Sequence, residues 1–143
     1  MASGPATPAG YSGTPLPRKL GIKDGHRVLL SGAPAGFRDT LGTLPGDVTL
    51  ATRAARRDFD VILLFAKDEA RLAARLAALK ERIHSAGAIW LCWPKKASGV
   101  RTDLDGNVVR GTGLAAGLVD VKVCAVDETW SGLRFVYRVA DRP

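Results

Sequence analysis

The chain has 143 residues, of which 46% are hydrophobic and 24% are charged. This length and composition predict one soluble globular domain with a sizeable core. No apolar run approaches the roughly 20 residues of a transmembrane helix, and the opening MASGPATPAG lacks the basic and apolar regions of a secretory signal. We therefore expect a cytoplasmic protein with a flexible tail over residues 1–10 and a single α/β domain over residues 11–143.

Lysine and arginine together number 21 against 14 aspartates and glutamates, which gives a formal net charge of +7. Such an excess favours polyanions or anionic small molecules in a general way. The cations are dispersed along the chain instead of forming a basic tail, and no helix-turn-helix or zinc-finger pattern accompanies them. A solvated basic surface is therefore a simpler interpretation than dedicated nucleic-acid binding.

Cys92 and Cys124 each lie inside an apolar, strand-like run, so we expect both to be buried, reduced thiols without a disulfide. No third or fourth ligand stands near them at zinc spacing, and His26 and His84 are isolated from both. The sequence therefore predicts no metal site.

The first half of the chain predicts a short helix and two strands. The helix is expected to begin at Thr14, as its N-cap, and to end at Gly21. Residues 26–30 then predict one strand and residues 48–52 another.

The loop over residues 31–37 follows the first strand, where α/β proteins build cofactor sites. It has no GxGxxG pattern, and Pro34 removes an amide N–H that could bind a phosphate. We therefore interpret it as a turn that leads into a short helix. The second strand is followed by Thr52 and Arg53, where many nucleoside sites have an acidic residue that bonds the ribose hydroxyls. The lack of an acidic residue at this position argues against an unmodified dinucleotide site.

The most apolar strands lie in the second half. Residues 59–66 predict a buried strand, and Asp68 caps a helix that we expect to run to Gly87 with His84 as a cation in its last turn. The run over residues 88–93 predicts a strand buried on both faces.

A looser helix follows, with Asp103 or Asp105 as its cap, and residues 119–126 and 133–139 predict two further strands. The connection between these strands is short, so they form an antiparallel hairpin. The whole pattern predicts a three-layer α/β sandwich with a mostly parallel, Rossmann-like sheet of about six strands in the order 2-1-3-4-6-5.

In such a sheet, the loops after the first, third, fourth and fifth strands leave at one end and should converge there. We expect a ligand site at this end, and its candidate residues are Lys95, Lys96, Ser98, Gly99, Trp93, Asp127, Glu128, Trp130 and Gly32. The lysines would supply charge, Ser98 and the Gly99 backbone would donate hydrogen bonds, and Trp93 or Trp130 would stack on a planar group. The alternative is a solvated lysine loop beside tryptophans of the core.

Two runs of the sequence carry a resemblance: Trp-Pro-Lys-Lys at residues 93–96 and Asp-Glu-Thr-Trp-Ser-Gly-Leu at residues 127–133. With the segment over residues 11–22, they resemble a bacterial family described as a domain of unknown function, number three-zero-five-two. The similarity covers nearly the whole chain from Tyr11 and implies no activity.

More distantly, the predicted strand order resembles a shortened class I methyltransferase sheet, from which one strand–helix unit is missing. That resemblance implies S-adenosylmethionine as a cofactor, bound by a glycine-rich loop after the first strand and an acidic residue after the second. Here residues 31–34 and the pair Thr52-Arg53 stand at those positions and depart from both features.

Three functional hypotheses remain open, and the cofactor is left unassigned. The first is a non-catalytic binding or regulatory domain for an anionic small molecule. The second is an enzyme, either a degenerate methyltransferase or one with Asp127 or Glu128 as a general base beside Lys95; these carboxylates would equally form an ion pair between two loops. The third is nucleic-acid binding through the basic surface.

Overall fold

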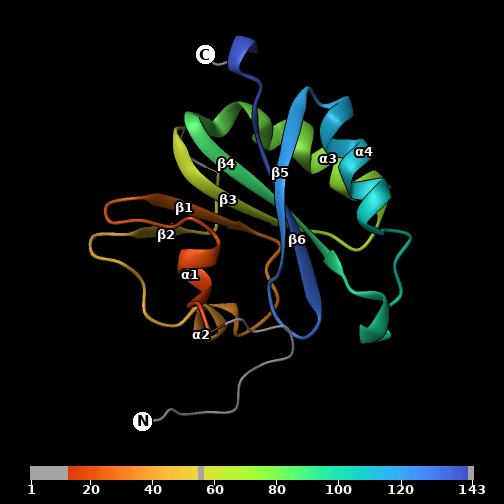
Figure 1. Cartoon of the computed structure of the whole chain (residues 1–143), viewed down its shortest axis with the longest axis horizontal. Coiled ribbons are helices and arrows are strands. Elements are labelled where there is room, and N and C mark those ends of the chain that lie inside the picture. Colours follow the sequence, from red (N-terminus) through yellow and green to blue (C-terminus); the bar gives the residue numbers. More distant parts are fainter. Residues whose placement is uncertain (1–12, 55–56, 142–143) are drawn as a thin grey trace.

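Six strands form one sheet in the order β2-β1-β3-β4-β6-β5 in the computed structural model of the protein, which describes residues 13–54 and 57–141 (Figure 1). The strands are β1 (Arg27–Ser31), β2 (Thr49–Ala51), β3 (Phe59–Phe65), β4 (Ile83–Pro94), β5 (Leu118–Ala125) and β6 (Trp130–Tyr137). The first four strands run parallel, whereas β6 is antiparallel to both β4 and β5. The predicted strand order and the terminal hairpin are confirmed.

Helices cover both faces of this sheet, so the predicted three-layer sandwich is also confirmed. The helices are α1 (Leu16–Lys19), α2 (Phe37–Leu41), α3 (Glu69–Leu79) and α4 (Gly106–Ala115), with 3-10 turns η1 (Lys80–Arg82), η2 (Lys96–Ser98) and η3 (Val139–Asp141). Apolar residues of α3 and α4 pack with one face of the sheet, and those of α1 and α2 pack with the other (Figure 1). None of the helices in the described ranges is long and apolar enough to span a membrane.

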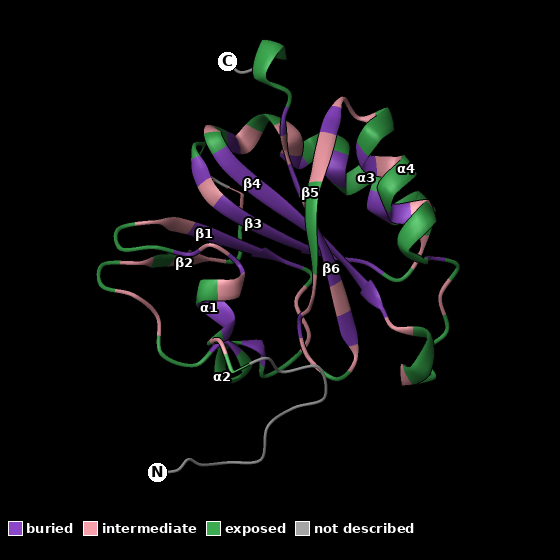
Figure 2. Cartoon of the chain, viewed as in Figure 1, coloured by how far each residue is buried: buried purple, intermediate pink, exposed green. Residues whose placement is uncertain are grey.

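Strand β4 lies between these two layers and is buried along most of its length, as Figure 2 shows. Its side chains alternate between the faces: Ile89, Leu91 and Trp93 enter the layer with α3 and α4, while Trp90 and Cys92 enter the layer with α1 and α2. The buried run predicted from the sequence is thus a central strand.

The indole of Trp90 fixes α1 to the sheet. Trp90 is completely buried, and its Nε1 donates a hydrogen bond to the backbone oxygen of Leu20 at 3.0 Å. Leu20 is the C-cap of α1, so this bond satisfies a carbonyl at the end of the helix. The same helix is held at the sheet edge by Lys19, whose Nζ donates to the backbone oxygen of Ala125 at 3.1 Å.

The helix expected to run to Gly87 is shorter in the structure. It ends at Leu79, and β4 begins at Ile83, so His84 lies in a strand and not at a helix end. The sequence pattern was misleading because Ile83 is buried through pairing with Phe59 of β3, which continues the apolar spacing of the helix. The register then shifts before Ala88, and a Cβ on Gly87 would come within 2.8 Å of the backbone oxygen of Asp60, so only glycine fits this irregularity.

Two other boundaries differ from the predictions. Strand β6 begins at Trp130, not at residue 133, because the turn before it is tight enough for Gly132 to pair with Cys92. The N-cap of α1 is Pro15 instead of Thr14, and no side chain of a described residue caps the start of this helix. Residues 1–12, which include the expected flexible tail, lie outside the described residues.

Helix α4 approaches the sheet closely at Gly113. A Cβ at this buried position would lie 2.1 Å from Cε2 of Phe135, whose ring is fully buried in the core. Gly111, in the same helix, is exposed, and a Cβ there would meet nothing within 4 Å. The two glycines therefore have opposite roles in stability.

We expect Gly113→Ala to lower the free energy of unfolding by about 1–3 kcal/mol, because the new methyl group displaces a packed ring. Gly111→Ala should raise it by about 0.5–1 kcal/mol, since alanine is the better helix former and has room. Urea denaturation of both variants measures the difference. Equal effects of the two substitutions would contradict the close packing at Gly113.

Trp90→Phe should lower the free energy of unfolding by about 2–4 kcal/mol, because it removes both buried volume and the hydrogen bond to Leu20. Trp93→Phe is the matched control, since Trp93 is also buried but makes no indole hydrogen bond to a described residue. Denaturation curves should therefore show the smaller loss for Trp93→Phe. If Trp93→Phe costs as much as Trp90→Phe, the bond to Leu20 does not stabilise the fold.

Candidate functional site

The loops expected to converge do meet at the carboxyl end of the parallel strands. The backbone N–H of Lys95, after β4, donates to the backbone oxygen of Thr129 in the β5–β6 turn at 2.7 Å. The hydroxyl of Thr102 donates to the backbone oxygen of Lys67, after β3, at 2.6 Å. In Figure 1, α2, η2 and the β5–β6 turn lie along the lower border of the molecule. The topology therefore brings the predicted loops to a common edge.

The lysine turn after β4 is held by its own hydrogen bonds. The hydroxyl of Ser98 donates to the backbone oxygen of Lys95 at 2.6 Å and accepts from the backbone N–H of Val100 at 3.2 Å. Gly99 ends the turn with φ +75°, in the left-handed region that favours glycine. Lys95 is half-buried and Lys96 is exposed, and neither ammonium group forms an ion pair with a described residue. Both charges are thus available on a defined turn, while the Ser98 hydroxyl is already engaged.

Asp127 organises the turn between β5 and β6. Its Oδ1 accepts hydrogen bonds from the backbone N–H groups of Thr129 and Trp130, at 2.8 and 2.7 Å. Glu128 is exposed, and within the described ranges neither carboxylate forms an ion pair with Lys95. Asp127 therefore has a structural task in this turn, and the expected ion pair between the two loops is not formed.

The tryptophans of the candidate site are buried on opposite faces of the sheet. Trp93 is 8% exposed and packs with the layer of α3 and α4, whereas Trp130 is 6% exposed and packs with the layer of α1 and α2. The ring of Trp130 packs edge to face against that of Phe65, with 5.1 Å between the ring centroids. Phe65 packs in the same way against Phe37, at 4.9 Å between centroids. A single planar ligand could not stack on both indoles.

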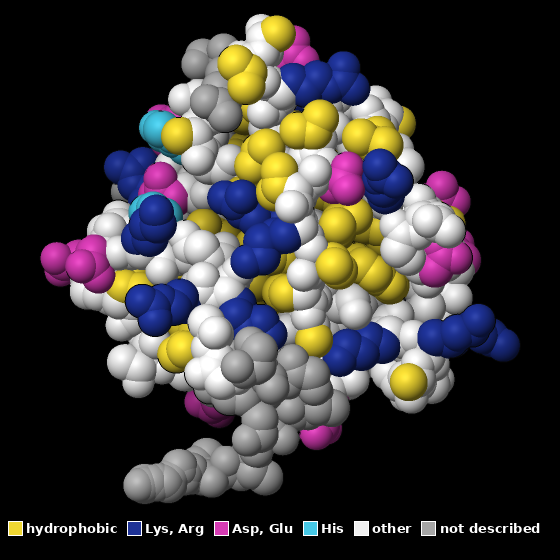
Figure 3. Space-filling view, viewed as in Figure 1, with side chains coloured by type: hydrophobic (Ala, Val, Ile, Leu, Met, Phe, Trp, Pro, Cys, Tyr) yellow, Lys and Arg dark blue, Asp and Glu magenta, His cyan; other side chains and the backbone are white. Residues whose placement is uncertain are grey.

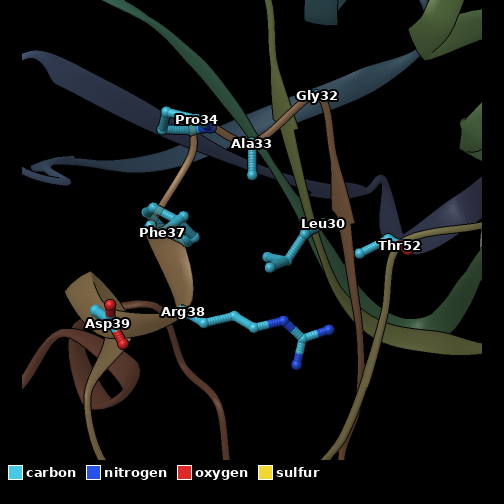
Figure 4. Close-up of a pocket in the computed structure, with 9 residues that line it drawn as sticks. Leu30, Gly32, Ala33, Pro34, Phe37, Arg38, Asp39 and Thr52 are labelled. Atoms are coloured by element: carbon cyan, nitrogen blue, oxygen red, sulfur yellow. The ribbon is translucent and has the colours of Figure 1, made fainter.

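Gly32 is the predicted site residue that lines a cavity. This cavity has a volume of about 520 Å³, lies beside the carboxyl ends of β1 and β2, and is lined by Leu30, Gly32, Ala33, Pro34, Gly36, Phe37, Arg38, Asp39 and Thr52 (Figure 4). Gly32 has φ +71°, and a Cβ on it would lie 2.8 Å from the backbone oxygen of Phe65. The glycine therefore lets the chain leave β1 close against the end of β3 and turn around the cavity.

Sequence reasoning missed Arg38, which is the cation in the lining of this cavity, next to the acidic Asp39 in the chain. It is exposed on α2, and in Figure 4 its side chain extends across the cavity toward Thr52, while Asp39 lies at the opposite end of the view. Its guanidinium makes no hydrogen bond or ion pair to any residue in the described part of the chain. The sequence could have indicated this residue. Phe37 and Leu41 are the inward-facing positions of the short helix expected after the loop, and Arg38 lies between them in the chain, so it belongs to the same helix at the edge of the sheet.

The two cysteines are free thiols in the structure. Burial raises the pKa of Cys92 well above its ordinary value, and the nearby Cys124 and Asp127 raise it further. Burial also raises the pKa of the half-buried Cys124, although Lys19, Lys122 and Lys95 act in the opposite direction. Both thiols are therefore protonated near neutral pH, which makes them poor nucleophiles.

The histidines lie away from this edge. His26 precedes β1 and accepts a hydrogen bond at Nδ1 from the backbone N–H of Lys23, at 3.1 Å, and His84 lies near the start of β4. Over residues 13–54 and 57–141, no group of three or more His, Cys, Asp and Glu side chains could hold a metal ion.

The fold is similar to that of methyltransferases. The protein shares 12% identity with a putative type 11 methyltransferase from Sulfolobus solfataricus, over 88% of this chain and 91% of that one, with a TM-score of 0.62. A structure described as a DhpI–SAH complex is similar at 12% identity, over 87% and 83% of the two chains, with a TM-score of 0.62. A SAM-dependent methyltransferase from Aquifex aeolicus shares 16% identity over 82% and 85% of the chains, with a TM-score of 0.53.

These likenesses show the fold alone. No curated protein matches the chain in sequence. A family model matches residues 35–139, which is more than half of the chain and includes the cavity residues from Gly36 to Thr52 as well as the lysine turn. The chain therefore belongs to the family described as "Protein of unknown function (DUF3052)".

Proposed function

We propose that this protein is a non-catalytic binding or regulatory domain that takes an anionic small molecule at the carboxyl end of its sheet. The observation that supports this function is the cavity of about 520 Å³ lined by Arg38, whose guanidinium is unpaired among the residues that the structure describes. This volume is within the range of about 300–1,000 Å³ typical of small-molecule sites. The cavity also lies at the edge where open α/β sheets bind their ligands.

The composition of the cavity suits an anion with an apolar body. Leu30, Ala33, Pro34 and Phe37 provide an apolar wall, and Arg38 provides a planar guanidinium that can donate two parallel hydrogen bonds. A carboxylate or phosphate would supply the acceptors that Arg38 lacks among the described residues.

The cations at the neighbouring strand ends would attract such a ligand. Lys67 follows β3, and Lys95 and Lys96 follow β4 at the same edge. These rim lysines, as we call the three, are exposed or half-buried and form no ion pair with a described residue. Charges of one sign around a site raise the rate at which an oppositely charged ligand arrives. We assign the rim lysines this role, with Arg38 as the direct contact.

The methyltransferase-like fold raises S-adenosylmethionine as an alternative ligand, and the residues present fit it poorly. Its sulfonium is cationic, whereas the side chain that crosses this cavity is the cationic Arg38. The end of β2 offers the hydroxyl of Thr52 where a carboxylate would bond the ribose. Asp127, the candidate general base, has Oδ1 engaged by two backbone N–H groups. These features favour binding of an anion over methyl transfer.

Nucleic-acid binding is the other alternative. Figure 3 shows lysine and arginine side chains dispersed over the face in view, interrupted by apolar side chains, without one continuous basic patch. The aromatic rings of Trp93 and Trp130 are buried, so they offer no stacking platform for bases. The dispersed cations and the buried indole rings therefore favour a small anionic ligand over a nucleic acid.

Anionic nucleotides should stabilise the protein more than S-adenosylmethionine does. In a thermal-shift screen, a ligand at a hundredfold excess over its Kd should raise Tm by roughly 5–10 °C. Arg38→Gln should abolish this shift, while Arg71→Gln, an exposed arginine of α3 on the other face of the sheet, should leave it unchanged. A screen of nucleotides, coenzyme A, S-adenosylmethionine and S-adenosylhomocysteine in which only the adenosylated sulfur compounds bind would refute the proposed anion site.

Replacement of Lys95 and Lys96 by alanine should weaken anion binding about 3- to 10-fold at low salt and leave unfolding unchanged, because their ammonium groups pair with no described residue. The effect should shrink at high salt. Titration calorimetry at two salt concentrations measures it, and Arg110→Gln, in helix α4 and charge-paired with Asp120, is the control. Loss of folding in the double variant would instead identify the lysine turn as purely structural.

A further inference from the structure

The end of β2 presents a hydroxyl and a positive charge where a nucleoside site ordinarily has a carboxylate. Thr52 lines the cavity, and Arg53 and Ala54 follow it in the chain. Asp39 is the acidic residue of the cavity lining, and Figure 4 shows it on α2, well separated from Thr52. The hydroxyls of an unmodified ribose would therefore find no carboxylate at the end of β2.

Arg38 lines the same cavity from helix α2. In Figure 4 its side chain extends from α2 toward the side of the cavity on which Leu30 and Thr52 lie, and its guanidinium has no partner among the described residues. Arg53 is exposed and likewise forms no ion pair with a described residue. Two arginines without a partner among the described residues are thus available, Arg38 in α2 and Arg53 directly after Thr52.

In α/β sheets, the residue type after the second strand indicates whether the bound ribose is unmodified or phosphorylated. A carboxylate after the second strand accepts hydrogen bonds from ribose hydroxyls, whereas an arginine at that place binds a phosphate attached to the ribose. A guanidinium donates two parallel hydrogen bonds to phosphate oxygens and keeps its charge at any physiological pH. The residues around Thr52 match the second case.

We propose that the ligand of this cavity is a nucleotide with a phosphate on the 2′ or 3′ position of its ribose, and that Arg38 recognises this phosphate, with Arg53, the residue after Thr52, as a further cation at the end of β2. The base would pack toward the apolar wall formed by Leu30, Ala33 and Pro34. The Thr52 hydroxyl would donate a hydrogen bond to the same phosphate. This inference rests on the proposed function and names its ligand class.

The test compares nucleotides that have the same base and the same number of phosphates. Titration calorimetry with 2′,5′-ADP, 3′,5′-ADP and 5′-ADP should show at least one of the first two binding about 10- to 100-fold more tightly than 5′-ADP. If 5′-ADP binds as tightly as 2′,5′-ADP and 3′,5′-ADP do, the ribose-phosphate inference is wrong and the anion site stands. If none of the three binds and coenzyme A, which also has a 3′-phosphate, does not bind either, both the inference and the proposed function fail.

Variants then assign the recognition to the named residues. Arg38→Gln should remove the preference for the ribose phosphate, Arg38→Lys should restore only part of it, and Arg71→Gln should preserve it in full. Thr52→Asp should reverse the preference in favour of 5′-ADP, because the new carboxylate bonds ribose hydroxyls and repels a phosphate. Both Arg38 and Thr52 are exposed, and denaturation curves verify that each variant is folded. A preference that survives Arg38→Gln unchanged would overturn the assignment.

Discussion

The burial of β4 on both faces is the constraint on which the rest of the structure depends. This strand joins the parallel half of the sheet to the antiparallel hairpin, since it pairs with β3 on one side and with β6 on the other. Alternate side chains enter two separate apolar layers, so each layer must be closed by its own helices. The hydrogen bond from Trp90 to Leu20 connects this central strand to the terminal helix α1, which makes even the short N-terminal element part of the core.

The strand directions also determine where the charged loops of the protein lie. Because β1, β3 and β4 are parallel, the segments that follow them leave at one edge, and the antiparallel hairpin returns its turn to that edge through Lys95 and Thr129. Charged residues of these four segments therefore lie near the carboxyl ends of the strands. The cavity itself lies to one side of this edge and is lined by residues of α2 and by Thr52 at the end of β2.

The methyltransferase-like fold and the residues at this edge lead to different expectations. Similarity at 10–16% identity to solved methyltransferases establishes the shape of the sheet, but a shared fold does not carry a shared activity. Gly32, Arg38 and Thr52 are among the residues that line the cavity at this edge, and the end of β2 has Thr52 and Arg53 where a nucleoside site ordinarily has a carboxylate. The proposed anionic ligand therefore rests on Arg38 and not on the fold.

The sequence by itself determined the strand order, the sandwich and the convergence of the loops, because long apolar runs such as residues 59–65 and 88–93 and the short hairpin connection allow few topologies. It did not determine where helix α3 ends, since Ile83 fits a helical spacing and a strand pairing equally well and only its contact with Phe59 decides between them. It also did not identify the burial of Trp93 and Trp130 on opposite faces or the position of Arg38 across the cavity from Thr52. These features depend on strand register and on the placement of a five-residue helix, which arise from packing between segments distant in the chain.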